Sequence, residues 1–252
     1  MKKILVLLLM GTTLATYSQK TDLSTVNTVT PKKGQKMAFE AAYKVHIAKF
    51  HTATEKLSVY EIISGPHNGS YHLVNGGRTF ADFDKERADA TAHNLDLDKN
   101  FYPYLEETMN GTYRFMDSLS IHPDSAGEKF IVNVRTIKLS MEEDYRKEQA
   151  RSAKVLSGLK GGFWDHLSVN VFEQIWDGSE PVVVSLRNLK DGFKSLETDY
   201  YGAAKPGDPT FKDAYIKAYG TLDWDKRVKL LADAVEKNEQ YIMKLRKDLS
   251  SQ

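Results

Sequence analysis

The sequence predicts an α+β protein made of two similar halves, each running strand, helix, strand, strand, helix, with one long helix at the C-terminus. Three observations predict this fold class. A pattern of residues recurs after about 110 positions, each half contains a dipeptide typical of hairpin turns, and apolar residues after residue 223 follow a helical spacing.

The repeat is clearest in two pairs of segments. Residues 25–32 (TVNTVTPK) match residues 131–138 (IVNVRTIK), with Val, Asn, Thr and Lys at corresponding places. Residues 59–63 (VYEII) match residues 171–175 (VFEQI), and each is followed by a turn and another apolar run. The period is too long for a solenoid repeat, so we expect a duplicated domain.

The elements follow from local patterns. β-Branched runs predict strands, and Asn68-Gly69 and Asp177-Gly178 predict the hairpin turns. Apolar residues at helical spacing predict the helices, which the prolines of residues 203–209 interrupt. We expect strands at 24–32 and 129–138, hairpins at 57–64 with 70–75 and at 167–176 with 181–187, a short fourth strand near 119–122, and helices at 36–55, 79–92, 101–118, 141–158, 189–199, 209–219 and 223–249.

This order resembles the ferredoxin-like β-α-β-β-α-β unit. Two fused ferredoxin-like halves in tandem resemble the dimeric α+β barrel superfamily, which includes antibiotic-biosynthesis monooxygenases, haem-degrading enzymes and stress-responsive barrel proteins. The resemblance covers residues 24–200 and rests on the element order and the repeat. It implies an antiparallel sheet with helices on one face and a ligand cavity between sheet and helices. We expect the first half to span residues 19–125 and the second, with the C-terminal helix, residues 126–252.

The N-terminus has the order of a secretory signal peptide. Lys2 and Lys3 precede an unbroken apolar run over residues 4–10, and small residues follow. The run is far shorter than the ~20 residues of a membrane helix. We interpret residues 1–18 as a cleavable signal peptide, with cleavage after Ser18 or, alternatively, after Ala15, which predicts a periplasmic or secreted protein.

Composition limits the classes of partner. The chain has no cysteine, so no disulfide framework or cysteine nucleophile is expected. Its formal charge of +1 becomes −1 when the two lysines of the signal peptide are removed, and it has no basic block. These features give no reason to expect a nucleic-acid partner, and no later stretch is expected to span a membrane. The sequence indicates neither a cofactor nor an oligomeric state.

Histidines give the first candidate site. His67 and His72 flank a hairpin turn with Tyr71 beside them, and Glu61 lies on the paired strand, so the two imidazoles and Glu61 could form a metal or acid–base cluster, and His67 and Tyr71 are candidates for ligand binding. The alternative is a solvated turn histidine and a strand histidine packed beside the tyrosine. His46 and His51 are five residues apart, about 140° around a helix, so we expect them not to share a face.

A pair of carboxylates gives the second candidate site. Glu61 and Glu173 occupy matching strand positions and, in a barrel, could face one central cavity as catalytic acid and base. The alternative is a position at a strand edge.

Residues 96–107 give a weak calcium candidate. Asp96, Asp98, Asn100 and Glu107 stand at positions 1, 3, 5 and 12 of an EF-hand loop. Phe101 stands where that loop needs glycine, which favours a polar loop whose Asp98 or Asn100 caps a helix.

Three further residues are candidates for ligand binding. Arg78 follows a Gly-Gly turn and could hold an anionic group. Trp164 and Trp176 bracket a hairpin and could line an apolar pocket, although packing in the core is the alternative.

These candidates favour a protein that binds a small apolar or aromatic ligand in a cavity between sheet and helices. One alternative is a barrel-type monooxygenase or haem-handling enzyme that uses His72, His67 or Glu61. Another is a non-catalytic protein-interaction module. No motif decides whether the protein is an enzyme.

Overall fold

The structure is a computed structural model that describes residues 22–51, 56–124, 127–176, 180–196 and 210–251. Within these ranges, eight strands close into one barrel whose neighbouring strands are all antiparallel. The strand order around the barrel is β1-β3-β2-β8-β5-β7-β6-β4. The strands are β1 (Leu23–Pro31), β2 (Ser58–Ser64), β3 (Tyr71–Arg78), β4 (Leu105–Phe115), β5 (Lys129–Ile137), β6 (Val169–Trp176), β7 (Val182–Asn188) and β8 (Val235–Leu245).

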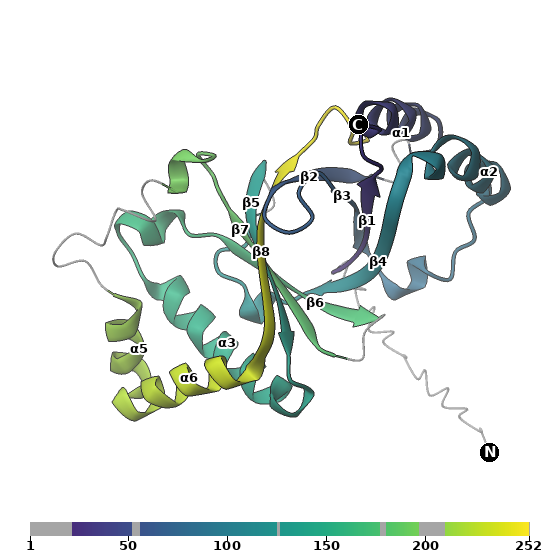
Figure 1. The fold of residues 1–252 in the computed structure, drawn as a ribbon. Coiled ribbons are helices and arrows are strands. Elements are labelled where there is room, and N and C mark those ends of the chain that lie inside the picture. The colour runs from purple at the N-terminus through teal and green to yellow at the C-terminus, as the bar shows by residue number, and fades with distance from the viewer. Residues whose placement is uncertain (1–21, 52–55, 125–126, 177–179, 197–209, 252) are drawn as a thin grey trace, which may run out of the picture.

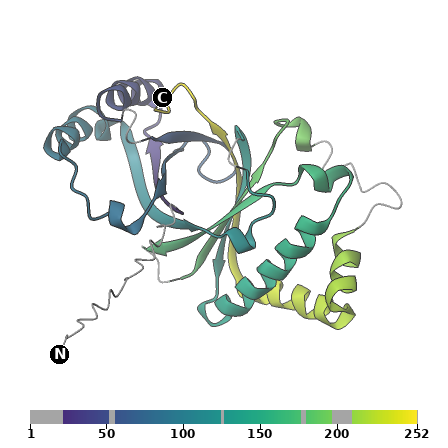
Figure 2. The ribbon, with the colours of Figure 1, turned by 180° about the vertical axis from the view of Figure 1, so that it is seen from behind.

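The helices form two groups on opposite sides of the barrel (Figures 1 and 2). One group, α1 (Lys36–Phe50) and α2 (Ala90–Asn100), covers β4-β1-β3-β2. The other group covers β8-β5-β7-β6 and consists of α3 (Glu142–Gly158), α5 (Phe211–Tyr219) and α6 (Thr221–Ala234). No helix among the described residues is both long and apolar enough to cross a bilayer.

Alternation along the strands creates two kinds of core. On β1, Val29 faces α1 and packs with Phe39 and Tyr43 of that helix. On β5, Phe130 and Val132 point the other way, into the barrel interior. Because successive side chains of a strand point to opposite faces, each strand serves an inner core and an outer, helix-covered core.

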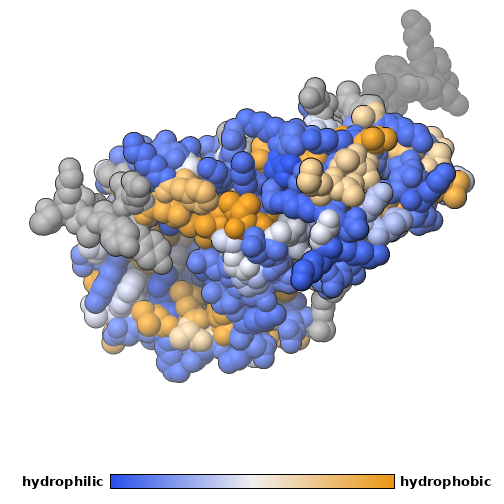
Figure 3. Space-filling view, turned by 45° about the horizontal axis from the view of Figure 1, so that its top comes forward, coloured by the Kyte–Doolittle hydropathy of each residue, from blue (hydrophilic) through white to orange (hydrophobic). Residues whose placement is uncertain are grey.

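The surface is mostly hydrophilic. Figure 3 shows one face on which apolar residues gather in separate patches divided by polar ones. The apolar side chains that are most exposed are scattered over different elements, for example Met37 on α1 and Leu222 on α6.

Most predicted elements are confirmed. The strands that begin each half, both hairpins, and the helices at 36–55, 141–158 and 209–219 are present, although α1 ends at Phe50. The signal peptide, the turn at 177–178 and the loop at 203–209 lie outside the described residues, as does the end of the helix predicted at 189–199.

The long C-terminal helix is wrong after residue 234. The chain leaves α6 there and continues as β8, which lies between β2 and β5 and joins the two halves of the barrel. Tyr241 and Met243 alternate into the barrel interior. In residues 235–245 the apolar side chains fit a helical spacing and also the alternation of a strand. Pairing of this segment with β2 on one side and β5 on the other selects the strand.

Two further predictions for the first half are wrong. The helix predicted at 101–118 is the strand β4, which pairs with β1 and β6, and the short strand expected near 119–122 is reduced to an isolated bridge between Ile121 and Val169. The helix predicted at 79–92 is a short turn at Phe80–Asp82, and α2 begins only at Ala90. Polar residues such as Glu106 and Glu107 lie on an exposed stretch of this strand, so its sequence lacks the apolar pattern by which strands are recognised.

Candidate metal centre between sheet and helices

A cavity of about 460 Å³ lies between the outer face of the first-half sheet and the helices α1 and α2. Its floor comes from β1, β3 and β4 and mixes apolar with polar side chains, among them Asn27 and Asn110 directly opposite each other on neighbouring strands. One wall carries three histidines: His46 of α1, His51 immediately after that helix, and His93 of α2.

His46 is placed by the apolar stripe of α1. Phe39, Tyr43 and Ile47 of that helix are buried against the sheet, and His46 shares their side of the helix. Its side chain is only 2% exposed and its ring lies against Phe50 and Phe101. Burial lowers the pKa of His46, against the opposing effect of its hydrogen bond to Asp96, which favours the neutral imidazole at neutral pH.

His51 reaches the same point because α1 has already ended. Its backbone N–H still bonds the carbonyl of Ile47, but its φ of −120° and ψ of 74° are not helical. Its ring therefore turns back toward His46 instead of pointing away at the helical angle. The sequence-based expectation that the two histidines lie apart assumed a helix that continued through His51, and it is wrong.

Arg87 sets the position of His93. Its guanidinium donates to the carbonyl of Phe50 at 2.5 Å and to Asp89 at 2.5 Å, immediately before α2. A cation at the end of α1 satisfies an unpaired carbonyl and complements the helix dipole. The start of α2 is thereby held at the end of α1, which brings His93 beside His51.

The three ring nitrogens have the spacing of metal ligands. The Nε2 atom of His51 lies 3.3 Å from Nε2 of His46 and 3.2 Å from Nε2 of His93. One ligand nitrogen from each residue fits within a group whose atoms all lie within 4.8 Å of one another. Nitrogens bound to a tetrahedral zinc ion at about 2.0–2.1 Å are about 3.3–3.4 Å apart, so the two distances from His51 suit such an ion.

Hydrogen bonding alone does not explain this convergence. A ring nitrogen carries either one hydrogen or one lone pair in the ring plane. The single Nε2 of His51 therefore cannot make good hydrogen bonds to both neighbouring nitrogens. A cation that accepts all three lone pairs removes the conflict.

Asp96 supplies the outer partner that metal-binding histidines usually have. Its carboxylate accepts a hydrogen bond from Nδ1 of His46 at 2.8 Å, which leaves the lone pair of that ring on Nε2. Asn100 donates to the same carboxylate at 3.0 Å, and Lys49 lies 3.6 Å from it. The hydrogen bond from His46 lowers the pKa of Asp96, so the carboxylate stays charged.

The three histidines share their cavity with a buried tyrosine hydroxyl. Among the described residues, no group hydrogen-bonds the buried hydroxyl of Tyr43, which lines the same cavity. Buried hydroxyls normally have a partner, so this hydroxyl can serve a bound molecule. A zinc ion held by three imidazoles with its fourth position free would have the ligand set of a catalytic rather than a structural site.

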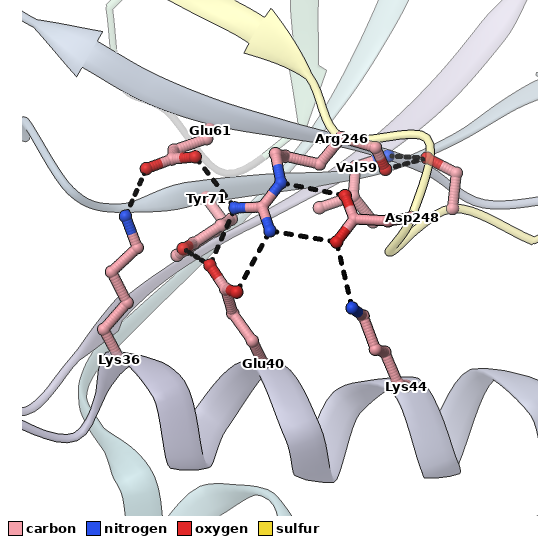
Figure 4. Close-up of polar contacts among 9 residues, drawn as sticks. Lys36, Glu40, Lys44, Val59, Glu61, Tyr71, Arg246 and Asp248 are labelled. Carbon is pink, nitrogen blue, oxygen red and sulfur yellow. Dashed lines mark hydrogen bonds and ion pairs between the residues drawn. The ribbon is translucent and has the colours of Figure 1, made fainter.

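Glu61 lies outside this site, on the helix-covered face of β2 (Figure 4). It pairs with Lys36 and accepts a bond from Arg246 at 2.9 Å. Arg246 also forms a fork to Glu40 at 2.7 and 3.0 Å. Glu61 therefore belongs to an ionic clamp, formed by Arg246 with Glu40, Glu61 and Asp248, that ties the C-terminal segment to α1.

Glu173 and Glu61 do not share a central cavity. Glu173 also lies on a helix-covered face, where it pairs with Arg146 of α3 and lines a separate cavity of about 170 Å³. Burial raises the pKa of Glu173, and Arg146 opposes this effect. In each strand the neighbours of the glutamate, Tyr60 and Phe172, point into the barrel instead.

The cluster of His67, His72 and Glu61 does not form, because His72 and Glu61 point to opposite faces of the sheet. His72 points into the barrel, whereas Tyr71 points outward and donates to Glu40 at 2.5 Å. His67 stands in the turn with a φ of 63° and lies 3.8 Å from Glu239. Alternation along β3 separates His72 from Tyr71.

The EF-hand candidate is wrong as a calcium loop. Asp96, Asp98 and Asn100 lie within the helix α2, and Glu107 lies on β4, so the residues do not wrap around one point. Asp96 instead serves His46.

The remaining candidates separate. Arg78 lines the metal-site cavity, donates to the carbonyl of Asp82 at 2.9 Å and stacks on Phe83. Trp176 packs against Phe83 and lines the cavity beside Glu173. Trp164 packs against a core cluster of the second half, away from the other two.

The comparisons with known proteins concern the fold. No family model matches the chain, and no curated protein matches it significantly. The structure is similar to that of a proposed monooxygenase from Lactobacillus acidophilus (TM-score 0.53, 8% identity, covering 92% of this chain and 96% of that one). It is also similar to an anthrone oxidase-like protein (TM-score 0.54, 12% identity, 90% and 92%) and to a proposed monooxygenase from Fusobacterium nucleatum (TM-score 0.50, 8% identity, 90% and 94%). At 8–12% identity, this likeness shows that the chain shares its overall fold with these proteins.

Proposed function

We propose that the protein binds a zinc-class divalent ion through His46, His51 and His93 and uses it to hold a small oxygen-bearing molecule in the cavity between sheet and helices. The observation that carries the proposal is the convergence of three ring nitrogens. Nε2 of His51 lies 3.3 Å from Nε2 of His46 and 3.2 Å from Nε2 of His93. Imidazole nitrogens are preferred ligands of zinc and related transition metals.

The cavity supports an oxygen-bearing ligand better than the apolar one expected from the sequence. Its floor carries amide and hydroxyl side chains, including Asn27, Asn110 and Thr108, and the Tyr43 hydroxyl and Arg78 lie at its walls. An ion with an open position can polarise a carbonyl or lower the pKa of a bound water. The side chains of the chain itself would orient the ligand oxygen and donate hydrogen bonds to it.

Metal binding is tested by titrating the metal-free protein with zinc against a chromophoric chelator. We expect one zinc per chain, an affinity that falls at least 100-fold in His51→Ala, and no change in His166→Ala, which removes an exposed histidine elsewhere. Equal zinc affinity in all three proteins would contradict the site.

Ligand binding is tested separately, with acetohydroxamate as an oxygen-donor probe. The zinc-loaded protein should bind it, and the metal-free protein should not. Tyr43→Phe should weaken the probe about fivefold, the worth of one hydrogen bond, while leaving zinc affinity unchanged. Binding that ignores the metal would contradict this part of the proposal.

A second candidate is the barrel-type monooxygenase or haem-handling enzyme, which the fold likeness favours. The donor set fits a haem poorly, because haem iron takes an axial side chain on a face of the macrocycle, whereas three nitrogens crowd one point here. Haem titration of the metal-free protein distinguishes the two candidates. A Soret band that zinc does not suppress would favour haem.

The two halves and the exported state also remain proposals. The strand orders β4-β1-β3-β2 and β8-β5-β7-β6 are those of two ferredoxin-like units and support a duplication. Export is tested by the intact mass of the protein from its native compartment, which should begin at Gln19.

A further inference from the structure

The barrel encloses a second cavity that shares no lining residue with the metal centre. All eight strands line its volume of about 200 Å³. On β1, Ser24, Val26 and Thr28 point into it, whereas Thr25 and Asn27 point outward to the metal-site cavity. Its walls are mainly apolar, and the aromatic side chains include Phe130 of β5.

The size of this cavity suits one aromatic ring with a short substituent. A cavity of about 150 Å³ lined by apolar side chains is large enough to bind benzene. Small eight-stranded barrels either fill the interior with side chains or hold one small ligand. The inner cavity here matches the second case.

A short chain of polar side chains crosses the inner wall. The hydroxyl of Thr28 lies 2.8 Å from Nδ1 of His72, and the hydroxyl of Tyr241 lies 2.9 Å from Nε2 of the same ring. All three side chains line the cavity. Burial lowers the pKa of His72 to about 4, so the ring is neutral at neutral pH and carries one N–H.

The number of hydrogens in these three side chains shows that one hydrogen-bond donor is left for a ligand. Two hydroxyls and one neutral ring carry three hydrogens, and the two contacts use two of them. If Thr28 donates to the ring, the ring donates to Tyr241, and the Tyr241 hydrogen is left over. If Tyr241 donates to the ring, the Thr28 hydrogen is left over. Either tautomer therefore leaves one hydroxyl hydrogen at the cavity wall.

We propose that the barrel interior is a second ligand site, which takes a one-ring apolar molecule bearing one hydrogen-bond-accepting oxygen, such as an aryl ketone. The apolar strands hold the ring, and the spare hydroxyl hydrogen of the Thr28–His72–Tyr241 chain bonds the oxygen. The site is independent of the proposed metal centre, and its ligand needs no metal.

The probes are acetophenone and ethylbenzene, which have similar shape and differ in the oxygen. Both are titrated into metal-free protein labelled with ¹³C at the methionine methyl groups. Met243 lines the inner cavity, whereas Met109 is exposed on β4 and serves as the control. We expect both probes to move the Met243 signal and leave Met109 unchanged, with acetophenone binding about fivefold more tightly, the worth of one hydrogen bond.

Variants show which hydroxyl donates a hydrogen bond to the acetophenone oxygen. Either Tyr241→Phe or Thr28→Val should remove the fivefold preference, according to which residue holds the spare hydrogen. Val184→Phe, which narrows the cavity, should weaken both probes. A Met243 signal that neither probe moves, or a preference that survives in both hydroxyl variants, would overturn the proposal. Displacement of the probes by zinc would place them at the other cavity and would also overturn it.

Discussion

Replacing Arg246 with alanine tests whether the ionic clamp holds the end of the chain on the barrel. Five contacts use the five N–H groups of its guanidinium: three to Glu40 and Glu61, and two to Asp248. The segment after β8 also pairs with β2, because the Arg246 N–H bonds the carbonyl of Val59 at 2.8 Å. The clamp therefore fixes the strand that joins the two halves.

The magnitude follows from exposure. The Asp248 side chain is 49% exposed, so its bonds contribute little. Glu40 and Glu61 are only 19% and 14% exposed, and removing the cation leaves Glu40 with only the Tyr71 hydroxyl and Glu61 with only Lys36 as a partner. Breaking a fully buried pair costs about 3–5 kcal/mol, and partial exposure places the expected loss at about 3 kcal/mol. For a protein of this size that lowers Tm by about 6–12 °C.

The assay is urea unfolding, followed by circular dichroism, with two comparison variants. Arg246→Lys keeps the charge but not the fork, so we expect about half of the loss. Lys247→Ala removes an exposed pair with Glu128 and should change the unfolding free energy by less than about 0.5 kcal/mol. A loss in Arg246→Ala no larger than that in Lys247→Ala would refute the reasoning.

Three other contacts can be tested in the same way. Asp96→Asn should lower zinc affinity about 10–100-fold without unfolding the protein, as measured by chelator competition, because the orientation of His46 is lost; an unchanged affinity would argue against its supporting role. Gly65→Ala should destabilise the protein by more than about 1 kcal/mol in urea unfolding, since φ is +78° and a Cβ would lie 2.6 Å from the Gln240 carbonyl; a neutral result would contradict the close approach. The Arg246 hydrogen bonds lower the pKa of Glu40 from 4.5, so its contribution is present above pH 4.5 and is lost as pH falls through the lower folded value. The difference in stability between the wild type and Arg246→Ala should therefore shrink below pH 4.5, and a constant difference would be inconsistent with it.

The sequence predicts the elements whose pattern has one interpretation. Residues close together in the sequence determine the β2–β3 hairpin, which has Asn-Gly at its turn, and the helix α1, which has a buried apolar stripe. β4 and β8 are not, because each combines charged residues with apolar ones that suit either period. Only pairing with strands distant in the sequence, such as β5 with β8, selects the strand.

The site is harder to predict because its ligands come from two helices. His46 and His51 look unsuitable when both are placed on one continuous helix, and His93 is more than forty residues from either. The sequence does not predict that the first helix ends at Phe50, and this end is what lets His51 turn toward His46. The Glu61–Glu173 pair failed for the opposite reason, since matching positions in two halves place the carboxylates on separate faces, each beside its own arginine.

X-ray absorption spectroscopy at the zinc edge of the zinc-loaded protein measures the proposed metal centre itself. We expect a four-coordinate ion with three imidazole nitrogens at about 2.0–2.1 Å and one lighter ligand from solvent. We also expect one imidazole signal to disappear in His93→Ala. A six-coordinate, all-oxygen environment, or a spectrum that is the same in His93→Ala, would contradict the proposed metal centre.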